Sequence, residues 1–374
     1  GQNGVLRLGT ALSDSTGVSD RLELNGPGAV ASGSTQLQIV NLQGLGALTL
    51  GDGITVVSAV NGATTTAQTT KDAFSLAGGH VVAGAYEYNL YAADASGAGE
   101  NWYLRSTLTT VPVTPVPPTQ PSTPAVHIPT CRTEVPLLAA LPEQLRQGNL
   151  AMLGNLHQRI GSNAVRGEPT AQGWGRVLGT KLKIGQSGTV SPSSDGNLEG
   201  FQIGSDLYAD DDWHAGLYVG DLKGNMDVKG FARGIDNLSV GHNDLHSQYL
   251  GGYATWTGAT GLYVDTVLQR GRHDDDAHSQ GGKVSGKGDS WLASVEMGQP
   301  FALNSAWSVE PQVQLVQQHL DLDDAHIGST RVRQDVDQGW MARLGARLEG
   351  DYATGAGRVQ PYGRVNLYRA ANGN

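Results

Sequence analysis

The chain has 374 residues, of which 53 are glycine, 16% are charged and 6% are aromatic, and its formal net charge is −10. Much glycine and little charge favour a repetitive β-sheet protein, because glycine destabilises helix interiors, and the acidic balance argues against nucleic acid as a partner. No run of 18 apolar residues is present, which excludes a transmembrane helix but not strands, whose alternation hides their hydrophobicity.

Residues 1–108 are expected to form a β-solenoid. Short alternating apolar pieces, such as residues 22–24 and 37–40, are separated by turn signals at Asn25-Gly26 and Asn61-Gly62. Each coil of a solenoid buries its apolar face only against its neighbours, which suits such short strands at regular spacing. An ordinary β-sandwich is the alternative that spacing alone leaves open.

A proline-rich linker is predicted for residues 109–130. Seven prolines lie between positions 112 and 129, interleaved with Thr, Val and Ser. Such a segment favours the extended polyproline conformation and acts as a semi-rigid spacer. We therefore place the clearest domain boundary of the chain here.

The region 131–165 is predicted to contain one helix, at residues 142–160, with Pro142 in its first turn and Gly161 at its end. Apolar side chains recur near helical spacing at Leu145, Met152, Leu153, Leu156 and Ile160. Several charged and amide side chains make this helix too polar to face lipid. It either plugs the polar interior of a barrel or packs as an amphipathic helix on a soluble sheet.

Residues 166–374 contain nine strand-like segments. They are expected at 171–182, 196–208, 212–220, 246–256, 260–270, 287–298, 306–319, 338–350 and 358–369. Short connections alternate with long polar ones at 183–195, 221–245, 271–286 and 320–337. This is the pattern of a transmembrane β-barrel with extracellular loops on one rim and periplasmic turns on the other. An odd number of strands cannot close such a barrel, so a strand is miscounted or the C-terminal end is missing.

Alternation within the strands predicts which side chains face lipid and which face the lumen. In 201–208, Phe201, Ile203 and Leu207 form an apolar set opposite Gln202 and Asp206. A soluble sandwich would show the same alternation, and the separation of long and short connections favours the barrel. The candidates for the lumen-facing charged set are Asp206, Asp265, Glu296, Arg343, Arg347 and Arg364. Strand parity then puts the end of the helix on the periplasmic side and the N-terminal domain outside the cell.

Motifs for catalysis and metal binding are weak. Residues 273–278 and 319–326 combine His and Asp, but they fall in or beside the expected extracellular loops, where a solvated acidic loop is the favoured interpretation. No serine-nucleophile elbow, phosphate-binding loop or zinc-protease motif is present. We predict no metal, no cofactor and no catalysis on an external substrate. The single cysteine, Cys131, cannot form an intramolecular disulfide.

Several motifs in fixed order give the chain a resemblance to a known family. They lie at 101–106, in the proline-rich linker, and at 134–137, 151–157, 173–176, 251–254, 291–294 and 360–362. In this combination the chain resembles the pertactin-like (type V) autotransporters of Gram-negative bacteria.

The resemblance implies an all-β protein of two parts. Residues 1–108 would be the end of a right-handed passenger β-helix, with Asn101, Trp102, Tyr103 and Leu104 in a self-chaperoning cap. The translocator would be a helix-plugged barrel of twelve strands, so residues 166–374 would contain about nine of the twelve and be truncated at the C-terminus. An open sheet in lipid would leave edge groups unpaired, which supports the truncation.

Function follows from the same resemblance. The barrel would lie in the outer membrane, export the passenger and display it on the cell surface. Its partners would be outer-membrane lipid, the barrel-assembly machinery, periplasmic chaperones and, through the passenger, host surface molecules. The alternative function is that of a surface adhesin or other virulence factor, carried by the passenger. A porin-like channel is a further, less favoured alternative.

Self-cleavage is a separate hypothesis that the resemblance raises. In some members of the family an asparagine side chain attacks its own carbonyl inside the lumen, helped by an acid of the barrel. Asn149 and Asn155 are the candidate asparagines here, and Asp265 or Glu296 the candidate acids. The favoured alternative is that these polar side chains simply join the helix to the wall.

Overall fold

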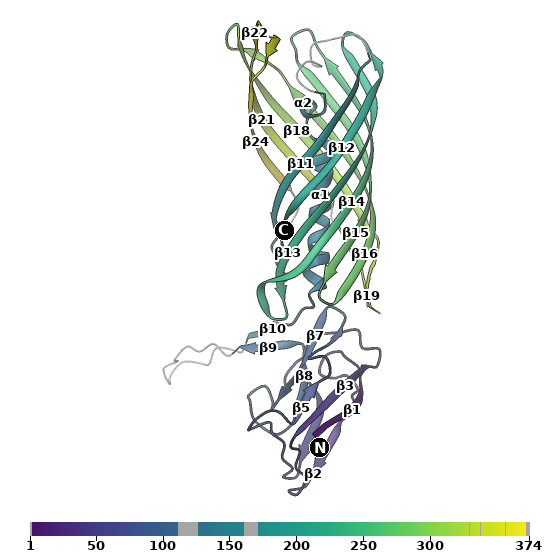
Figure 1. Cartoon of the computed structure of the whole chain (residues 1–374), viewed down its shortest axis with the longest axis vertical. Helices are drawn as coiled ribbons and strands as arrows, with labels where there is room; N and C mark the ends of the chain where they lie inside the picture. The colour runs from purple at the N-terminus through teal and green to yellow at the C-terminus, as the bar shows by residue number, and fades with distance from the viewer. Residues whose placement is uncertain are drawn as a thin grey trace, which may run out of the picture.

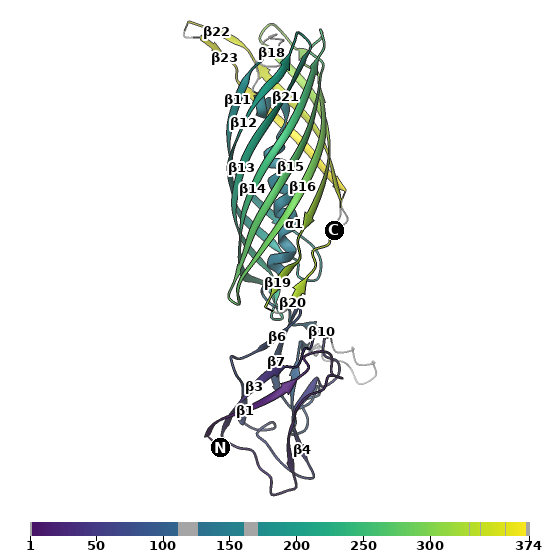
Figure 2. The same cartoon turned by 90° about the vertical axis from the view of Figure 1, so that its right-hand side faces the viewer.

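The computed structural model describes residues 2–110, 126–160, 171–328, 330–336, 338–355 and 357–371. The described chain forms a small N-terminal β domain and a long curled sheet that surrounds a helix (Figure 1). Figure 2 shows the β domain below one rim of the sheet, with the helix running along the interior of the sheet. In these ranges no helix is both long and apolar enough to cross a membrane.

The N-terminal domain is a short β-helix. Its strands are β1 (Gln2–Thr10), β2 (Leu22–Asn25), β3 (Ser34–Asn41), β4 (Ile54–Val60), β5 (Phe74–Leu76), β6 (Val81–Ala83), β7 (Tyr86–Ala92) and β8 (Trp102–Arg105). Strands β1, β3 and β5 stack in parallel, and so do β2 and β4. Parallel strands from successive coils are the rungs of a solenoid, so this prediction is confirmed and the sandwich alternative is wrong.

The last part of this domain is antiparallel. Strand β8 pairs with β4 on one side and with β7 on the other, and β7 also pairs with β6. These antiparallel strands cover the end of the parallel stack. The core between them contains Leu8, Leu12, Leu37, Ile54, Val56, Val57, Phe74, Leu76, Tyr88, Trp102 and Leu104.

Most of the predicted linker lies outside the described residues. Its two ends form an antiparallel pair, β9 (Thr107–Thr110) with β10 (Val126–Pro129). The polyproline conformation expected between them, and the part of the plug region at 161–165 with the predicted helix end at Gly161, also fall outside the described residues.

The predicted single helix is two helices with an earlier start. Helix α1 spans Glu134–Leu153 and α2 spans Leu156–Ile160, so the predicted start at Pro142 is wrong and this proline lies inside α1. Proline removes one helix hydrogen bond, and the burial of the apolar first turns, including Leu137 and Leu141, against the sheet offsets that loss. The chain breaks between the helices at Gly154, which has a left-handed φ of +62°.

Nine long strands form the curled antiparallel sheet, and each corresponds to one predicted segment. They are β11 (Gly173–Gly185), β12 (Ser193–Ala209), β13 (Trp213–Ala232), β14 (Ile235–Thr257), β15 (Tyr263–Ser279), β16 (Gly282–Gly298), β18 (Trp307–Leu322), β21 (Gly339–Gly350) and β24 (Tyr362–Ala371). Within the described residues, β11 and β24 are the two edges of this sheet.

Five short strands complete the structure. Strand β17 (Phe301–Ala302) extends the edge of β18, and two small hairpins are β19 (Ala325–Ile327) with β20 (Thr330–Val332) and β22 (Tyr352–Thr354) with β23 (Gly357–Val359).

The predicted long loops on one rim are mostly wrong. Strands β13 and β14 continue through the expected loop and turn at Arg233 and Gly234, both with positive φ, while β15 and β16 turn at Gln280 and Gly281. The loop expected at 183–195 shrinks to the residues between β11 and β12. On this rim only the connection from β18 to β21 stays long, and it contains the β19–β20 hairpin. On the opposite rim the connection from β21 to β24, predicted to be short, contains the β22–β23 hairpin. The rim on which the long loops were expected is nevertheless the rim beside the N-terminal domain, as strand parity predicted (Figures 1 and 2).

Candidate functional site

The half of the sheet away from the N-terminal domain has an apolar outer face, which we call the apolar band. Its exposed outward side chains include Val177, Phe201, Ile203, Leu207, Leu217, Val219, Leu250, Leu268, Trp291, Val295, Leu315, Trp340 and Leu344. Leu207 is 73% exposed and Leu268 62%. Apolar surface this extensive and contiguous is unfavourable in water and marks a surface that another apolar phase covers.

Aromatic residues flank the band. Trp291 and Trp340 lie outward at the edge of the band that is nearer the N-terminal domain, and Trp213 and Phe301 lie outward near the opposite rim. Aromatic girdles at both edges of an apolar belt are typical of outer-membrane barrels, because an amphipathic ring is stable at the boundary between hydrocarbon and water.

The other half of the wall, which we call the extension, has a polar outer face. The change occurs within single strands: along the outward positions of β13, Leu217 and Val219 are followed by Asp221, Lys223 and Asn225. Strand β13 has 20 residues and β14 has 23, whereas roughly 9–11 residues suffice to cross a bilayer. About half of each strand therefore exceeds the length that a bilayer requires, and this half has the polar outer face.

The inner face changes polarity in the opposite sense at the same level. Inside the extension, Leu198, Leu222, Met226, Val228, Leu245 and Leu320 pack with Leu137, Leu141 and Leu145 of α1. Inside the apolar band the inward side chains are mostly polar or charged. The extension thus resembles a soluble protein folded around a helix, and the band resembles a membrane barrel with a polar lumen.

The predicted lumen-facing residues lie mainly inside the band. Asp206, Asp265, Glu296, Arg343 and Arg347 project inward and are at most 9% exposed. Arg364 is opposite Arg347 in the β21–β24 register and so shares its face, but it is exposed because β24 is a sheet edge.

A buried ion pair joins the plug to the wall. Arg159 of α2 donates from Nη2 to Oδ1 of Asp265 at 2.6 Å, and both side chains are at most 3% exposed. Thr255 donates to the same carboxylate oxygen at 2.6 Å, and the guanidinium lies 4.5 Å from the ring centroid of Tyr253. Arg159 was not among the predicted site residues, because its partner is 106 positions away and only the barrel register brings them together.

A second polar contact joins α2 to β16 and β18. His157 Nε2 lies 2.8 Å from Oε1 of Glu310, and the hydroxyl of Tyr263 donates to Glu310 at 3.2 Å and to Glu296 at 2.9 Å. Glu296 also pairs with Arg343 at 3.1 Å. The charges of the lumen are therefore arranged in networks that fix α2, as buried charges require.

Arg176 of β11 holds the end of α1. Its guanidinium donates to the carbonyl oxygens of Ala151 and Met152, and its Nε donates to Gln202 at 2.7 Å. A positive charge beside the last carbonyls of a helix satisfies groups that have no intrahelical partner and complements the helix dipole.

The predicted plug residues lie at this helix–wall interface. Leu145, Met152, Leu153 and Leu156 are at most 3% exposed, while the side chain of Ile160 lies outside the described part. Met152 packs closely against Gly220, where a Cβ atom would meet its sulfur at 2.8 Å.

Both candidate asparagines for self-cleavage are engaged by neighbours. Asn149 accepts from Ser290 at 3.3 Å, and its main-chain carbonyl accepts from Gln269. Asn155 accepts from the backbone N–H of Gln158 at 2.8 Å, which makes it the N-cap of α2. Glu296 lies 3.3 Å from the N–H of Leu156, so one candidate acid is beside the Asn155–Leu156 bond. The capping bond gives the Asn155 carboxamide a structural role.

The four predicted cap residues of the N-terminal domain close its last rung. Trp102 packs edge-on against Phe74 with centroids 5.3 Å apart and donates from Nε1 to Thr65 at 3.1 Å. Leu104 is fully buried, and Asn101 accepts from the backbone of β4 and donates to the Tyr103 hydroxyl. The adjacent Arg105 hydrogen-bonds two carbonyls, and burial lowers its pKa.

The N-terminal domain is joined to the rim of the extension by contacts that the sequence did not indicate. Arg233, in the β13–β14 turn, donates to Glu87 of β7 at 3.0 Å and through its backbone to Cys131 at 2.8 Å. Leu108 lies against Gly234, where a Cβ atom would meet it at 2.1 Å. These contacts fix the domain on the extension rim.

The structure does not bring the two His- and Asp-containing stretches, 273–278 and 319–326, into one site. His273 faces inward between Ser247 and Ser290, at 2.8 Å from each. His278 faces outward and lies with His242 and Asp244, the one group of three metal-capable side chains found among the described residues. His319 and His326 join no such group within those residues.

Comparison with known proteins identifies relatives for both parts. Residues 173–374 match the family described as the autotransporter β-domain, and residues 1–90 match the family described as autochaperone domain type 1. The predicted cap residues Asn101, Trp102, Tyr103 and Leu104 lie just beyond the second match.

Individual relatives are much longer than this chain. The adhesin BmaC autotransporter of Brucella suis biovar 1 (strain 1330) is 30% identical over 98% of this chain and 11% of its own length. The pertactin autotransporter of Bordetella bronchiseptica is 30% identical over 58% of this chain and 24% of its own length. The solved β domain of the Bordetella autotransporter BrkA is 23% identical, with a TM-score of 0.41 over 54% of this chain and 80% of that structure.

Proposed function

Because the chain belongs to the autotransporter β-domain family, we propose that its barrel lies in a bacterial outer membrane, holds the N-terminal domain outside the cell and is closed by α1 and α2. The observation that carries this proposal is the double change of polarity along the wall. An apolar outer face around a polar, plugged interior suits a membrane. A polar outer face around an apolar interior suits water.

The orientation follows from the same wall. The N-terminal domain and the start of α1 lie at the extension, and α2 lies inside the band near the opposite rim. Outer-membrane barrels extend further beyond the membrane on their extracellular side than on their periplasmic side, and here the long strands β13 and β14 carry the wall beyond the band on the side of the N-terminal domain. The extension and the domain that it carries therefore project from the cell surface, and α1 marks the route of a chain that has passed through the lumen.

Assembly in the membrane would depend on lipid, the barrel-assembly machinery and periplasmic chaperones. The apolar band supports a need for lipid, because its outward Leu, Val and Trp side chains have no other cover in the described structure. A strand edge in hydrocarbon is equally costly, so insertion and pairing of edges must occur together.

A role in adhesion is the second part of the proposal. The Brucella suis relative is named an adhesin, and the N-terminal domain is the part that would face a host surface. Cells that display the protein should adhere to a host-cell monolayer more than cells that display a variant without residues 2–110. Equal adherence of the two strains would contradict a role of the N-terminal domain in adhesion.

Conductance in planar bilayers tests the plug. The intact protein should conduct poorly, and a variant without residues 134–160 should open a large, steady pore, because α1 and α2 fill the lumen along its length. A matched control is Lys223→Ala on the outer wall, which should conduct like the parent. Heat-modifiable gel mobility shows that each variant is folded, and equal conductance of intact and helix-deleted protein would favour an open porin.

A further inference from the structure

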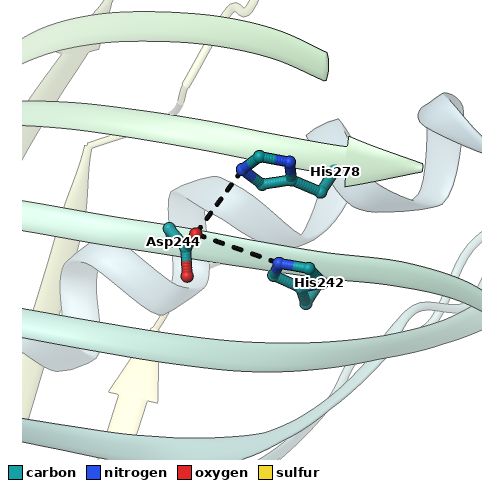
Figure 3. A group of neighbouring side chains, drawn as sticks. All are labelled: His242, Asp244 and His278. Carbon is teal, nitrogen blue, oxygen red and sulfur yellow. Dashed lines mark ion pairs between the residues drawn. The ribbon is translucent and has the colours of Figure 1, made fainter. Parts of the chain in front are cut away.

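His242, Asp244 and His278 form a compact group on the outer wall of the extension (Figure 3). Their ligand atoms all lie within 4.8 Å of one another. Asp244 Oδ2 lies 3.5 Å from Nε2 of His278 and 3.9 Å from Nε2 of His242. Both distances lie in the range of an ion pair and are longer than an ordinary hydrogen bond, and both are measured from the same carboxylate oxygen.

The strand register brings these residues together. His242 of β14 is directly opposite His278 of β15, and Asp244 follows His242 two positions later, so it projects from the same face. All three side chains are partly exposed, and the group lies well beyond the apolar band. An ion in solution can reach it directly.

The carboxylate is already oriented. Asn225 of β13 donates from Nδ2 to Oδ1 of Asp244 at 2.5 Å, which leaves Oδ2 toward the two histidines. A hydrogen bond that fixes a ligand from behind is the usual support of a metal site. Asp227, opposite His242 in the register, is exposed on the same face and adds negative potential without joining the group.

We propose that His242, Asp244 and His278 bind a Zn²⁺ ion, with water completing its coordination. Two imidazole nitrogens and one carboxylate oxygen are ligands that zinc accepts in tetrahedral geometry at about 2.0–2.2 Å. Two ligand atoms at that distance from one ion lie about 3.4 Å apart, close to the 3.5 Å between His278 and Asp244. This site is additional to the display function and does not depend on the plug.

Binding requires one small rearrangement. The two imidazole rings are stacked, with centroids 4.8 Å apart and planes within 13° of each other. A nitrogen lone pair lies in its ring plane, so at least one ring must turn before both nitrogens address the same ion. Rotation about χ2 of histidine is soft, and the exposed rings have room for it.

Zn²⁺ binding to the purified, detergent-folded protein tests the site. Competition with a colorimetric zinc chelator should give one high-affinity Zn²⁺ per chain. His242→Ala, His278→Ala and Asp244→Asn should each weaken binding about tenfold or more, because each removes one of three protein ligands. Cobalt bound in place of zinc should give the visible absorption of a tetrahedral site only when both histidines are present.

His246→Ala is the matched control. His246 lies on the same outer face and pairs with Asp221 at 2.8 Å, outside the group of three. This variant should bind zinc like the parent protein. Binding that is unchanged in His242→Ala and His278→Ala, or that falls equally in His246→Ala, would overturn the proposal. Heat-modifiable mobility of every variant separates a lost site from a lost fold.

Discussion

At the scale of single residues, the lumen shows how buried charge fixes the plug. Arg159 and Asp265 are almost completely buried and are bonded to each other. Asp265 also accepts from Thr255, and the Arg159 guanidinium lies over the ring of Tyr253. The intact pair has a small net effect on folding stability, because the cost of removing both charges from water offsets their attraction. A single charge left buried without its partner is strongly destabilising.

Asp265→Ala should therefore lower the free energy of unfolding by about 3–5 kcal/mol, because it leaves the Arg159 charge buried without its partner. The double variant Arg159→Met, Asp265→Ala should recover much of this loss, since it leaves no unpaired charge. Denaturant titration of the detergent-folded protein measures both effects. A double variant as unstable as Asp265→Ala would show that the ion pair does not explain the loss.

Trp102 is the corresponding residue of the N-terminal domain. Trp102→Ala removes its contact with Phe74 and the hydrogen bond to Thr65, and it should cost about 3–5 kcal/mol, as large-to-small changes in packed cores do. Faster proteolysis of this domain is the expected readout. Leu45→Ala is the control, because Leu45 is 88% exposed and should leave the rate unchanged. Unaltered protease resistance in Trp102→Ala would contradict a capping role.

At the scale of elements, α1 matches its wall along its length. Its first half presents leucines to the apolar interior of the extension, and its end is held by Arg176 and Gln202 inside the band. The break at Gly154 lets α2 turn its charged residues toward the wall. Both the backbone conformation at Gly154 and the closeness of Arg176 require the absence of a side chain there.

Gly154→Ala should destabilise the plug by about 1 kcal/mol or more, because alanine is unfavourable at positive φ. A Cβ atom would also meet the Arg176 guanidinium at 2.6 Å. The variant should unfold at lower temperature and show more frequent channel openings than the parent. Gly179→Ala is the control, since nothing lies within 4 Å of its Cβ position. Identical behaviour of the two variants would remove this role for Gly154.

The elements also show what the sequence could predict. The nine long strands were located because Leu, Val and Trp alternate with Asp, Glu and Arg in the band. The extension was mistaken for loops because its outward residues, such as Lys223 and Asn225, are polar. A period-two signal was present in Leu222, Met226 and Val228, in which the apolar positions had moved to the inner face.

The start of α1 was placed too late because Pro142 was assigned to the first turn, whereas it lies inside the helix. The earlier turns, with Leu137 and Leu141, pack against the apolar interior of the extension, a region that the sequence predicted as loops. Contacts between distant segments were beyond sequence reasoning, because Arg159 with Asp265 and His242 with His278 depend on the strand register.

At the scale of the whole molecule, the two halves of one sheet are suited to different surroundings. The sheet is continuous, but its outer and inner faces exchange polarity at the same level, so the apolar band is suited to lipid and the extension to water. The N-terminal domain is fixed to the rim of the extension by contacts of Arg233, Glu87 and Leu108. In the proposed orientation, this construction would display a folded domain at a defined distance above the membrane.

Labelling of single cysteines on β13 with a membrane-impermeant maleimide tests this account most directly. Three exposed outward or turn positions, in a Cys131→Ser background, sample the extension at Lys223, the apolar band at Leu217 and the short turn at Asp211. Lys223→Cys should label on intact cells, Leu217→Cys should stay unlabelled, and Asp211→Cys should label only after the outer membrane is permeabilised. Labelling of Leu217→Cys as strong as that of Lys223→Cys, or labelling of Asp211→Cys on intact cells, would contradict it.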